Sequence, residues 1–126
     1  MTTDAPHILV VEDDPAYRRL VVRMLKGAGF AVSDADGFVS ALDLVEKDPS
    51  IALLVMDIGM PAGEPHGIAI AQMSRHRRSQ LGVVYITGRD VADVRDHADG
   101  APVLQKPFAA EALVAAVRGV LDRARP

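Results

Sequence analysis

The sequence predicts an α/β protein built on a doubly wound, five-stranded parallel sheet. Short apolar runs alternate along the chain with longer segments whose hydrophobic residues recur at the spacing of an amphipathic helix. Near-continuous apolar runs are typical of strands that are covered on both faces, as in a parallel sheet. Strand–helix repeats joined by right-handed crossovers therefore place helices on both sides of one sheet.

Three of the strands are clear from their apolar composition. They are residues 7–11 (HILVV), 51–56 (IALLVM) and 82–86 (GVVYI). Residues 31–35 and 102–105 give a weaker strand pattern, which favours positions at the edges of the sheet. The three apolar strands are therefore expected at its centre.

A helical segment follows each strand, and three of these segments are strongly amphipathic. Hydrophobic residues repeat at helical spacing in the first of them, at Tyr17, Leu20, Val21, Met24 and Leu25. The stripe recurs at Phe38, Ala41, Leu42 and Val45, and again at Leu113, Val114, Val117, Val120 and Leu121. Residues 67–77 and 90–98 are less amphipathic, and we expect the helix over 90–98 to be loosely held.

Cap and turn residues support the same boundaries. Aspartates stand where N-caps are expected before three helices, at Asp14, Asp36 and Asp90. Pro15 then occupies the first position of its helix, and Gly27 and Gly29 close that helix. The first helix is therefore predicted to run from Pro15 to the region of Gly27.

Length and composition indicate one globular domain over residues 1–126, with no output domain attached. Hydrophobic residues make up 49% and charged residues 25% of the chain, which excludes a disordered protein. The absence of cysteine excludes disulfides, thiolate metal sites and cysteine nucleophiles. Because no apolar run could span a membrane and no secretory signal begins the chain, we expect a cytoplasmic protein without membrane contact.

The charge of the chain argues against direct binding to nucleic acid. The formal net charge is -3 and the pI is near 5.7, whereas neutralising phosphates requires a basic face. A local exception is the run Arg75-His76-Arg77-Arg78. We interpret this run as a helix C-terminus, where cations oppose the negative end of the helix dipole.

Polar residues follow four of the predicted strands. Glu12 and Asp13 follow the first strand, Asp57 the third, Thr87 the fourth and Lys106 the fifth. In open α/β sheets the ligand site lies beyond the carboxyl ends of the strands. We therefore expect these side chains to lie together at one edge of the sheet.

The carboxylates among these residues predict a metal ion. Three carboxylates in one place raise one another's pKa values unless a cation lies among them. The available donors are oxygens, which favours Mg²⁺ or Mn²⁺ over zinc, and Gly59 leaves its backbone carbonyl open to such an ion. Because Mg²⁺ in such sites is usually bound together with a phosphate, the residues predict phosphoryl transfer.

The order of these markers resembles the receiver domain of bacterial response regulators, in particular the single-domain, chemotaxis-regulator-like kind. The markers are the acidic pair after the first strand, Asp57 with Met60-Pro61, Thr87, and Lys106-Pro107-Phe108 before the last helix. They extend over nearly the whole chain. The resemblance implies a flavodoxin-like (βα)5 fold with strand order 2-1-3-4-5.

The resemblance also implies how the acidic residues act in two-component signalling. Asp57 would accept a phosphoryl group from a sensor histidine kinase or a histidine phosphotransfer protein, forming an acyl phosphate. Glu12, Asp13, Asp57 and the carbonyl of Gly59 would hold Mg²⁺, directly or through water. The chain would then catalyse only its own aspartyl phosphorylation and dephosphorylation, and it would not be an enzyme for other substrates.

Two further markers have implied roles at the phosphoryl group. Lys106 would pair with Asp57 and then with a phosphoryl oxygen, and Thr87 would donate a hydrogen bond to another phosphoryl oxygen. The resemblance implies a cis peptide bond between Lys106 and Pro107. Signalling would proceed by contact with a downstream protein or by phosphorelay, and whether the chain forms a homodimer is left open.

The sequence departs from the family pattern at several positions. Val103 stands where members often carry an aromatic residue whose rotamer reports phosphorylation, so the readout is expected to differ. The loop after Pro61 is longer than the usual turn, which affects the expected rim of the pocket. Gly59 and Gly88 lack side chains where other members carry groups that influence dephosphorylation, and we expect an open pocket.

Three other classes of protein are alternatives to a receiver domain. A phosphatase of the haloacid dehalogenase kind needs Asp-x-Asp after the first strand, whereas Asp57 follows the third. A flavodoxin-like cofactor carrier needs a first loop that accepts phosphate, and here that loop is acidic. The more serious rival is a receiver-like interaction module that binds its partner without phosphorylation, which Val103 favours and the complete set of site residues opposes.

Overall fold

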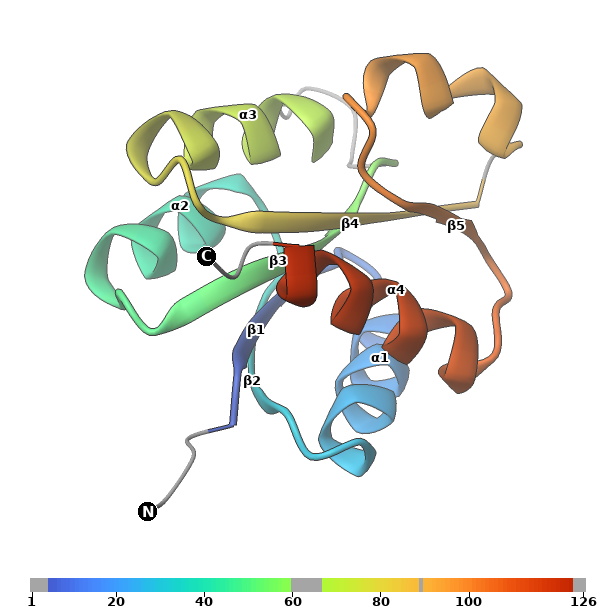
Figure 1. The fold of residues 1–126 in the computed structure, drawn as a ribbon, viewed down its shortest axis with the longest axis horizontal. Helices are drawn as coiled ribbons and strands as arrows, with labels where there is room; N and C mark the ends of the chain where they lie inside the picture. The colour runs from blue at the N-terminus through green and yellow to red at the C-terminus, as the bar shows by residue number, and fades with distance from the viewer. Residues whose placement is uncertain (1–4, 60–66, 89, 124–126) are drawn as a thin grey trace.

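The computed structural model describes residues 5–59, 67–88 and 90–123, which form a parallel sheet between two layers of helices (Figure 1). The strands are β1 (His7–Val11), β2 (Ala31–Ala35), β3 (Ile51–Asp57), β4 (Gly82–Thr87) and β5 (Val103–Gln105). The helices are α1 (Pro15–Gly27), α2 (Phe38–Lys47), α3 (Gly67–Arg77) and α4 (Ala110–Arg123), with two short 3-10 helices, η1 (Val91–Asp93) and η2 (Arg95–His97). The predicted fold class is confirmed.

The strands lie in the order β2-β1-β3-β4-β5, and all neighbouring pairs are parallel. This is the order that the resemblance implied. The three apolar strands occupy the centre of the sheet, and the two weaker strands form its edges, as predicted. The last strand begins at Val103, one residue later than expected.

Side chains of the central strands alternate between two hydrophobic cores. In β1, Leu9 and Val11 contribute to the core under α2 and α3, while Ile8 and Val10 contribute to the core under α1 and α4. The amphipathic stripes supply the helix side of these cores, with buried Val21, Leu25, Ala41, Leu42, Val45, Leu113 and Val117. Because both faces of the strands are covered, both sets of their side chains have to be apolar.

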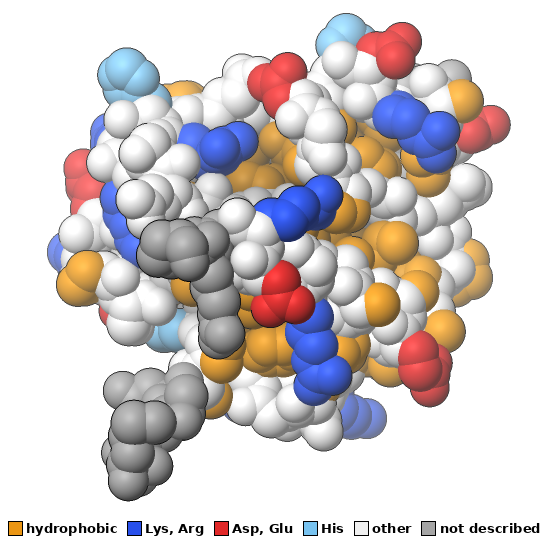
Figure 2. Space-filling model, viewed as in Figure 1, with side chains coloured by type: hydrophobic (Ala, Val, Ile, Leu, Met, Phe, Trp, Pro, Cys, Tyr) orange, Lys and Arg blue, Asp and Glu red, His pale blue; other side chains and the backbone are white. Residues whose placement is uncertain are grey.

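The edge of the sheet at β5 is less completely covered than its centre. Val103 and Leu104 are partly exposed, and hydrophobic side chains gather around α4 and β5 on the face seen in Figure 2.

The helices of the described residues are too short or too polar to cross a membrane.

The prediction of a helix over residues 90–98 is wrong. Two 3-10 helices, η1 and η2, occupy this segment, and their backbone hydrogen bonds join residues three apart. Asp90 is the N-cap as predicted, since its carboxylate accepts a hydrogen bond from the Ala92 N–H at 3.0 Å. Among the side chains described in this segment, the buried ones are Val94 and Ala98. A helix with so short an apolar stripe gains too little from packing to offset its ordering.

The ends of α1 and α2 confirm one predicted N-cap and correct another. Asp14 caps α1 through its side chain, and α1 ends at Gly27. The prediction of Asp36 as the N-cap of α2 is wrong, because Gly37 occupies that position. The carboxylate of Asp36 instead accepts a hydrogen bond from the Ser40 hydroxyl at 3.1 Å. A local side-chain bond has thus replaced the bond to the backbone.

Candidate functional site

The parallel register of the strands brings the predicted site residues to one edge of the sheet. Glu12 directly follows β1 and lies level with Asp57, the last residue of β3. Thr87 is the last residue of β4, and its carbonyl accepts a hydrogen bond from the Lys106 N–H at 2.7 Å. Residues that are far apart in the sequence are therefore neighbours because their strands end together.

Glu12, Asp13 and Asp57 form an acidic cluster whose carboxylate oxygens lie within 4.8 Å of one another. Glu12 is 0% exposed and Asp57 is 3% exposed, whereas Asp13 lies nearer to the solvent. Glu12 and Asp57 are therefore close together and largely shielded from water. Ionising all three carboxylates is therefore costly unless a cation joins them.

The crowding shifts two of these pKa values in opposite directions. Burial, followed by hydrogen bonding with Asp57, raises the pKa of Glu12 from 4.5 to about 7, although Lys106 opposes the rise. Burial also acts upward on Asp13, but hydrogen bonds with Glu12 and Asp57 outweigh it and lower the pKa of Asp13 below 3.8. Without a metal ion, the acidic cluster therefore keeps a proton until the pH reaches about 7.

Lys106 supplies one positive charge from the loop between β5 and α4. Its ammonium contacts Oε1 of Glu12 and lies 3.6 Å from Oδ1 of Asp57, so Glu12 is the closer partner. Burial acts to lower the pKa of Lys106, but the hydrogen bond with Glu12 and the charge of Asp57 outweigh it and raise that pKa. One ammonium cannot balance three carboxylates, which leaves a negative site.

One aromatic ring lies beside Lys106, and a second ring packs against the first. Its Nζ is 4.5 Å from the centroid of the Tyr17 ring, and that ring meets Phe108 edge to face at 5.9 Å and 76°. The sequence placed Tyr17 in the hydrophobic stripe of α1, and no motif marked it as part of the site. The peptide bond between Lys106 and Pro107 is cis, as the resemblance implied.

The donor set of the acidic cluster fits a hard divalent cation. Within the described residues, the three side chains of this cluster lie close enough together to share one metal ion, and each of them offers an oxygen as donor. Gly59 lies beside it, since its N–H donates to Oδ1 of Asp57 at 3.1 Å. Glu12, Asp13 and Asp57 could hold Mg²⁺ or Mn²⁺, and the carbonyl of Gly59 remains a predicted ligand.

The rim of the site near Thr87 is open. Thr87 itself is buried at 0% exposure, and among the described residues nothing lies within 4 Å of where a Cβ on Gly88 would stand. A Cβ on Gly59 would lie 3.8 Å from Oδ1 of Asp57, which is an ordinary van der Waals distance. The predicted marker Met60-Pro61 and the longer loop up to residue 66 lie outside the described residues.

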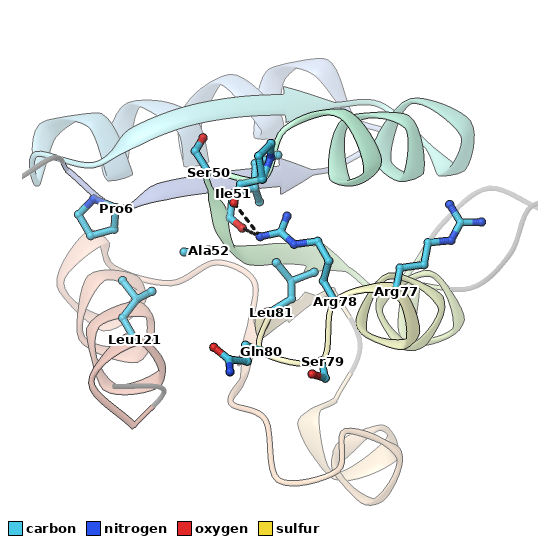
Figure 3. A pocket seen from close by; sticks show the side chains of 11 residues that line it. Pro6, Ser50, Ile51, Ala52, Arg77, Arg78, Ser79, Gln80, Leu81 and Leu121 are labelled. Carbon is cyan, nitrogen blue, oxygen red and sulfur yellow. Dashed lines mark hydrogen bonds between the residues drawn. The ribbon is translucent and has the colours of Figure 1, made fainter. Parts of the chain in front are cut away.

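A cavity lies at the other, amino-terminal end of the sheet (Figure 3). This cavity of about 660 Å³ is lined by residues of β3, the α3–β4 loop and α4. Arg78 projects into it and donates hydrogen bonds to the backbone carbonyls of Asp48, Pro49 and Ile51. The basic run 75–78 lies at the end of α3 as predicted. Its last residue, Arg78, holds the α2–β3 loop in place through these hydrogen bonds. The acidic cluster is therefore the stronger candidate site.

The fold and the acidic edge together define a class of protein. A 2-1-3-4-5 parallel sheet with carboxylates after β1 and β3 and a lysine after β5 is the arrangement expected of a receiver domain. A family model described as the response regulator receiver domain matches residues 8–118. The chain belongs to this family, whose members act in two-component signalling.

Individual relatives agree with this assignment. The response regulator MprA of Mycobacterium tuberculosis (strain ATCC 25618 / H37Rv) is 37% identical over 124 residues, which cover 94% of this chain and 52% of that protein. The chain thus spans about half the length of the curated relatives it matches.

Solved structures share the fold. A response regulator receiver protein from Sinorhizobium medicae WSM419 has a TM-score of 0.88 at 24% identity, over 98% of this chain and 100% of that chain. The response regulator protein TrrA from Thermotoga maritima, solved in complex with Mg²⁺-BeF, has a TM-score of 0.77 at 24% identity, over 90% of this chain and 97% of that chain.

Proposed function

We propose that the chain is a phosphoacceptor in two-component signal transduction and that Asp57 carries the phosphoryl group. The observation that carries this proposal is the environment of Asp57. Asp57 is 3% exposed, and its carboxylate lies in a group of three carboxylates within 4.8 Å of one another and has the Lys106 ammonium at 3.6 Å. A nucleophile that belongs to a candidate metal site and lies beside a lysine ammonium is suited to phosphoryl transfer.

In this proposal one carboxylate oxygen of Asp57 attacks the phosphorus of a phosphohistidine. The new P–O bond forms as the P–N bond breaks, and the imidazole leaves with the electron pair and takes up a proton. Mg²⁺ held by Glu12, Asp13 and Asp57 would supply neutralisation of the negative charge on the phosphoryl oxygens. Lys106 donates to one phosphoryl oxygen and the Thr87 hydroxyl to another. Attack by water on the phosphorus later breaks the P–O bond to Asp57 and releases inorganic phosphate, which returns the free carboxylate.

The proposed donor is a sensor histidine kinase or a histidine phosphotransfer protein in the cytoplasm. The family assignment supports this, since receiver domains belong to two-component signalling. A structural relative was solved in complex with Mg²⁺-BeF, which is consistent with Mg²⁺ as the ion here. We infer that residues 1–126 act as one receiver domain, which signals by contact with another protein or by phosphorelay.

Mass spectrometry of the intact protein tests the proposal. Incubation with acetyl phosphate and Mg²⁺ should add one phosphoryl group to the wild type, and chelation of Mg²⁺ should prevent the addition. Asp57→Asn should gain none, whereas Asp122→Asn, the same change at an exposed position of α4, should gain as much as the wild type. An equal gain of phosphoryl groups in Asp57→Asn would refute the assignment of Asp57 as the phosphoacceptor.

A receiver-like interaction module that acts without phosphorylation is the second candidate. Val103 favours it, because valine cannot reorient a ring as the family's usual aromatic does. Amide hydrogen exchange over residues 90–103, measured before and after phosphorylation, separates the two candidates. A change in exchange supports a phosphorylation readout, since the added charge of about -1.5 to -2 should reorganise this segment. Unchanged exchange supports the passive module.

A further inference from the structure

Tyr17 makes a contact with Lys106 that the family markers do not include. Its side chain projects from the first turn of α1, and Nζ of Lys106 lies 4.5 Å from the centroid of its ring. At this distance the negative face of an aromatic ring attracts an ammonium group. The edge-to-face contact with Phe108, at 5.9 Å and 76°, packs a second ring against that of Tyr17. Residues from α1 and from the β5–α4 loop therefore hold the ring against the lysine.

The three partners of Lys106 respond differently to a metal ion. Glu12 and Asp57 are carboxylates of the candidate metal site, and Glu12 is the closer of the two. A divalent cation bound there competes with the Lys106 ammonium for the charge of Glu12. The ring of Tyr17 is neutral and is not a ligand for Mg²⁺. Its contact with Lys106 therefore does not compete with metal binding.

A lysine ammonium stands on a flexible four-carbon stem and loses its position when a partner is withdrawn. We propose that Tyr17 is a positioning residue for Lys106, whose ammonium it keeps beside Asp57 when Mg²⁺ occupies the acidic cluster. The inference rests on the proposed function. It assigns Tyr17 no contact with the phosphoryl group and no part in metal binding, so its effect should appear in the rate of transfer.

Two substitutions of Tyr17 separate the effect of the aromatic ring from the effect of an apolar side chain at this position. Tyr17→Phe keeps the ring face, whereas Tyr17→Leu keeps an apolar side chain without a ring. Val22→Ala is the packing control, because Val22 lies on the same helix, is partly buried in the same core, and is not part of the Lys106 contact. The initial rate of phosphorylation by acetyl phosphate is measured at saturating Mg²⁺, with the affinity for Mg²⁺ measured alongside.

The ring contact predicts a specific pattern of rates. Tyr17→Phe and Val22→Ala should stay within about twofold of the wild type, while Tyr17→Leu should be slower by roughly fivefold, with unchanged Mg²⁺ affinity. In a Lys106→Met background, Tyr17→Leu should cause no further loss, because the ammonium is already gone. Equal rates in the leucine and phenylalanine variants, or the same fivefold loss without Lys106, would overturn the proposal.

Nuclear magnetic resonance gives a readout that does not depend on phosphorylation. The ring current of Tyr17 should shift the side-chain methylene signals next to the Lys106 ammonium in the wild type and in Tyr17→Phe, with and without Mg²⁺, but not in Tyr17→Leu. Loss of this shift when Mg²⁺ is added to the wild type would also overturn the proposal. A wild type that accepts no phosphoryl group refutes the proposed function and the role of Tyr17 together. A phosphorylated wild type with an unaffected Tyr17→Leu refutes the role of Tyr17 alone.

Discussion

Replacing Glu12 by glutamine tests the electrostatic account of the acidic cluster. The Glu12 side chain is fully buried beside Asp57 and Lys106, and its pKa is raised from 4.5 to about 7. Between these two pH values the folded chain keeps a proton on Glu12 that the unfolded chain has released. The free energy of unfolding of the metal-free protein therefore falls as the pH rises through this window.

The magnitude follows from the same pKa values. At about 1.4 kcal/mol per pKa unit, a rise from 4.5 to about 7 costs the metal-free fold about 3 kcal/mol once Glu12 is charged. Glutamine has nearly the same shape and no charge. Glu12→Gln should therefore be more stable than the wild type by up to about 3 kcal/mol at about pH 8, and similar to it at about pH 4.5. The lowered pKa of Asp13 acts below 3.8, outside this window.

Urea unfolding at both pH values, with a chelator and then with Mg²⁺, is the assay. Glu111→Gln is the matched control, because Glu111 is exposed on α4 and its replacement should change stability by less than about 0.5 kcal/mol. Mg²⁺ at about a hundredfold above its dissociation constant should stabilise the wild type by about 2.7 kcal/mol and the Glu12 variant by far less. The reasoning is refuted if Glu12→Gln is the less stable protein at high pH without metal.

Three further predictions concern packing, a buried phenol and a backbone contact. Gly67→Ala should destabilise the fold by about 3 kcal/mol or more in urea unfolding, because a Cβ there would lie 2.1 Å from the carbonyl oxygen of Asp57. Gly27→Ala, whose Cβ would meet nothing within 4 Å, is the control, and equal effects would contradict the prediction. Burial raises the pKa of Tyr85 from 10.0 to about 12, so its phenolate absorbance should appear only as the pH approaches that value, and titration near 10 would be inconsistent. Arg78→Ala should cost about 1–3 kcal/mol and speed amide exchange in the α2–β3 loop, because three carbonyl oxygens lose their donor, and unchanged exchange would count against that role.

The sheet and the acidic cluster could be predicted because each depends on a pattern that is local in the sequence. The runs 7–11, 51–56 and 82–86 are apolar on both faces, which is how buried parallel strands differ from half-exposed ones. Since parallel strands end together, Glu12 and Asp57 could be placed side by side without any structure. The burial that raises the pKa of Glu12 then follows from its position at the end of a central strand.

The remaining features depend on contacts that spacing cannot distinguish. Val94 and Ala98 are four residues apart, which suits one turn of a regular helix as well as the two 3-10 helices that are found. Tyr17 fits the hydrophobic stripe of α1 whether its ring meets core residues or the Lys106 ammonium. Gly67 gave no signal of its close approach to the backbone of Asp57, because that approach depends on the packing of α3 against β3.

The acidic cluster links metal binding to the stability of the fold. Without a cation, the charged form of Glu12 destabilises the folded chain, and the single ammonium of Lys106 only partly offsets this. A substitution that removes the charge improves the metal-free protein and weakens the candidate metal site, as is common for functional sites. A carboxylate in place of Tyr17 would attract Lys106 more strongly, but it would add a fourth acid to the site and would itself compete for the metal. A neutral ring attracts the ammonium without either effect, which is why an aromatic residue suits this position.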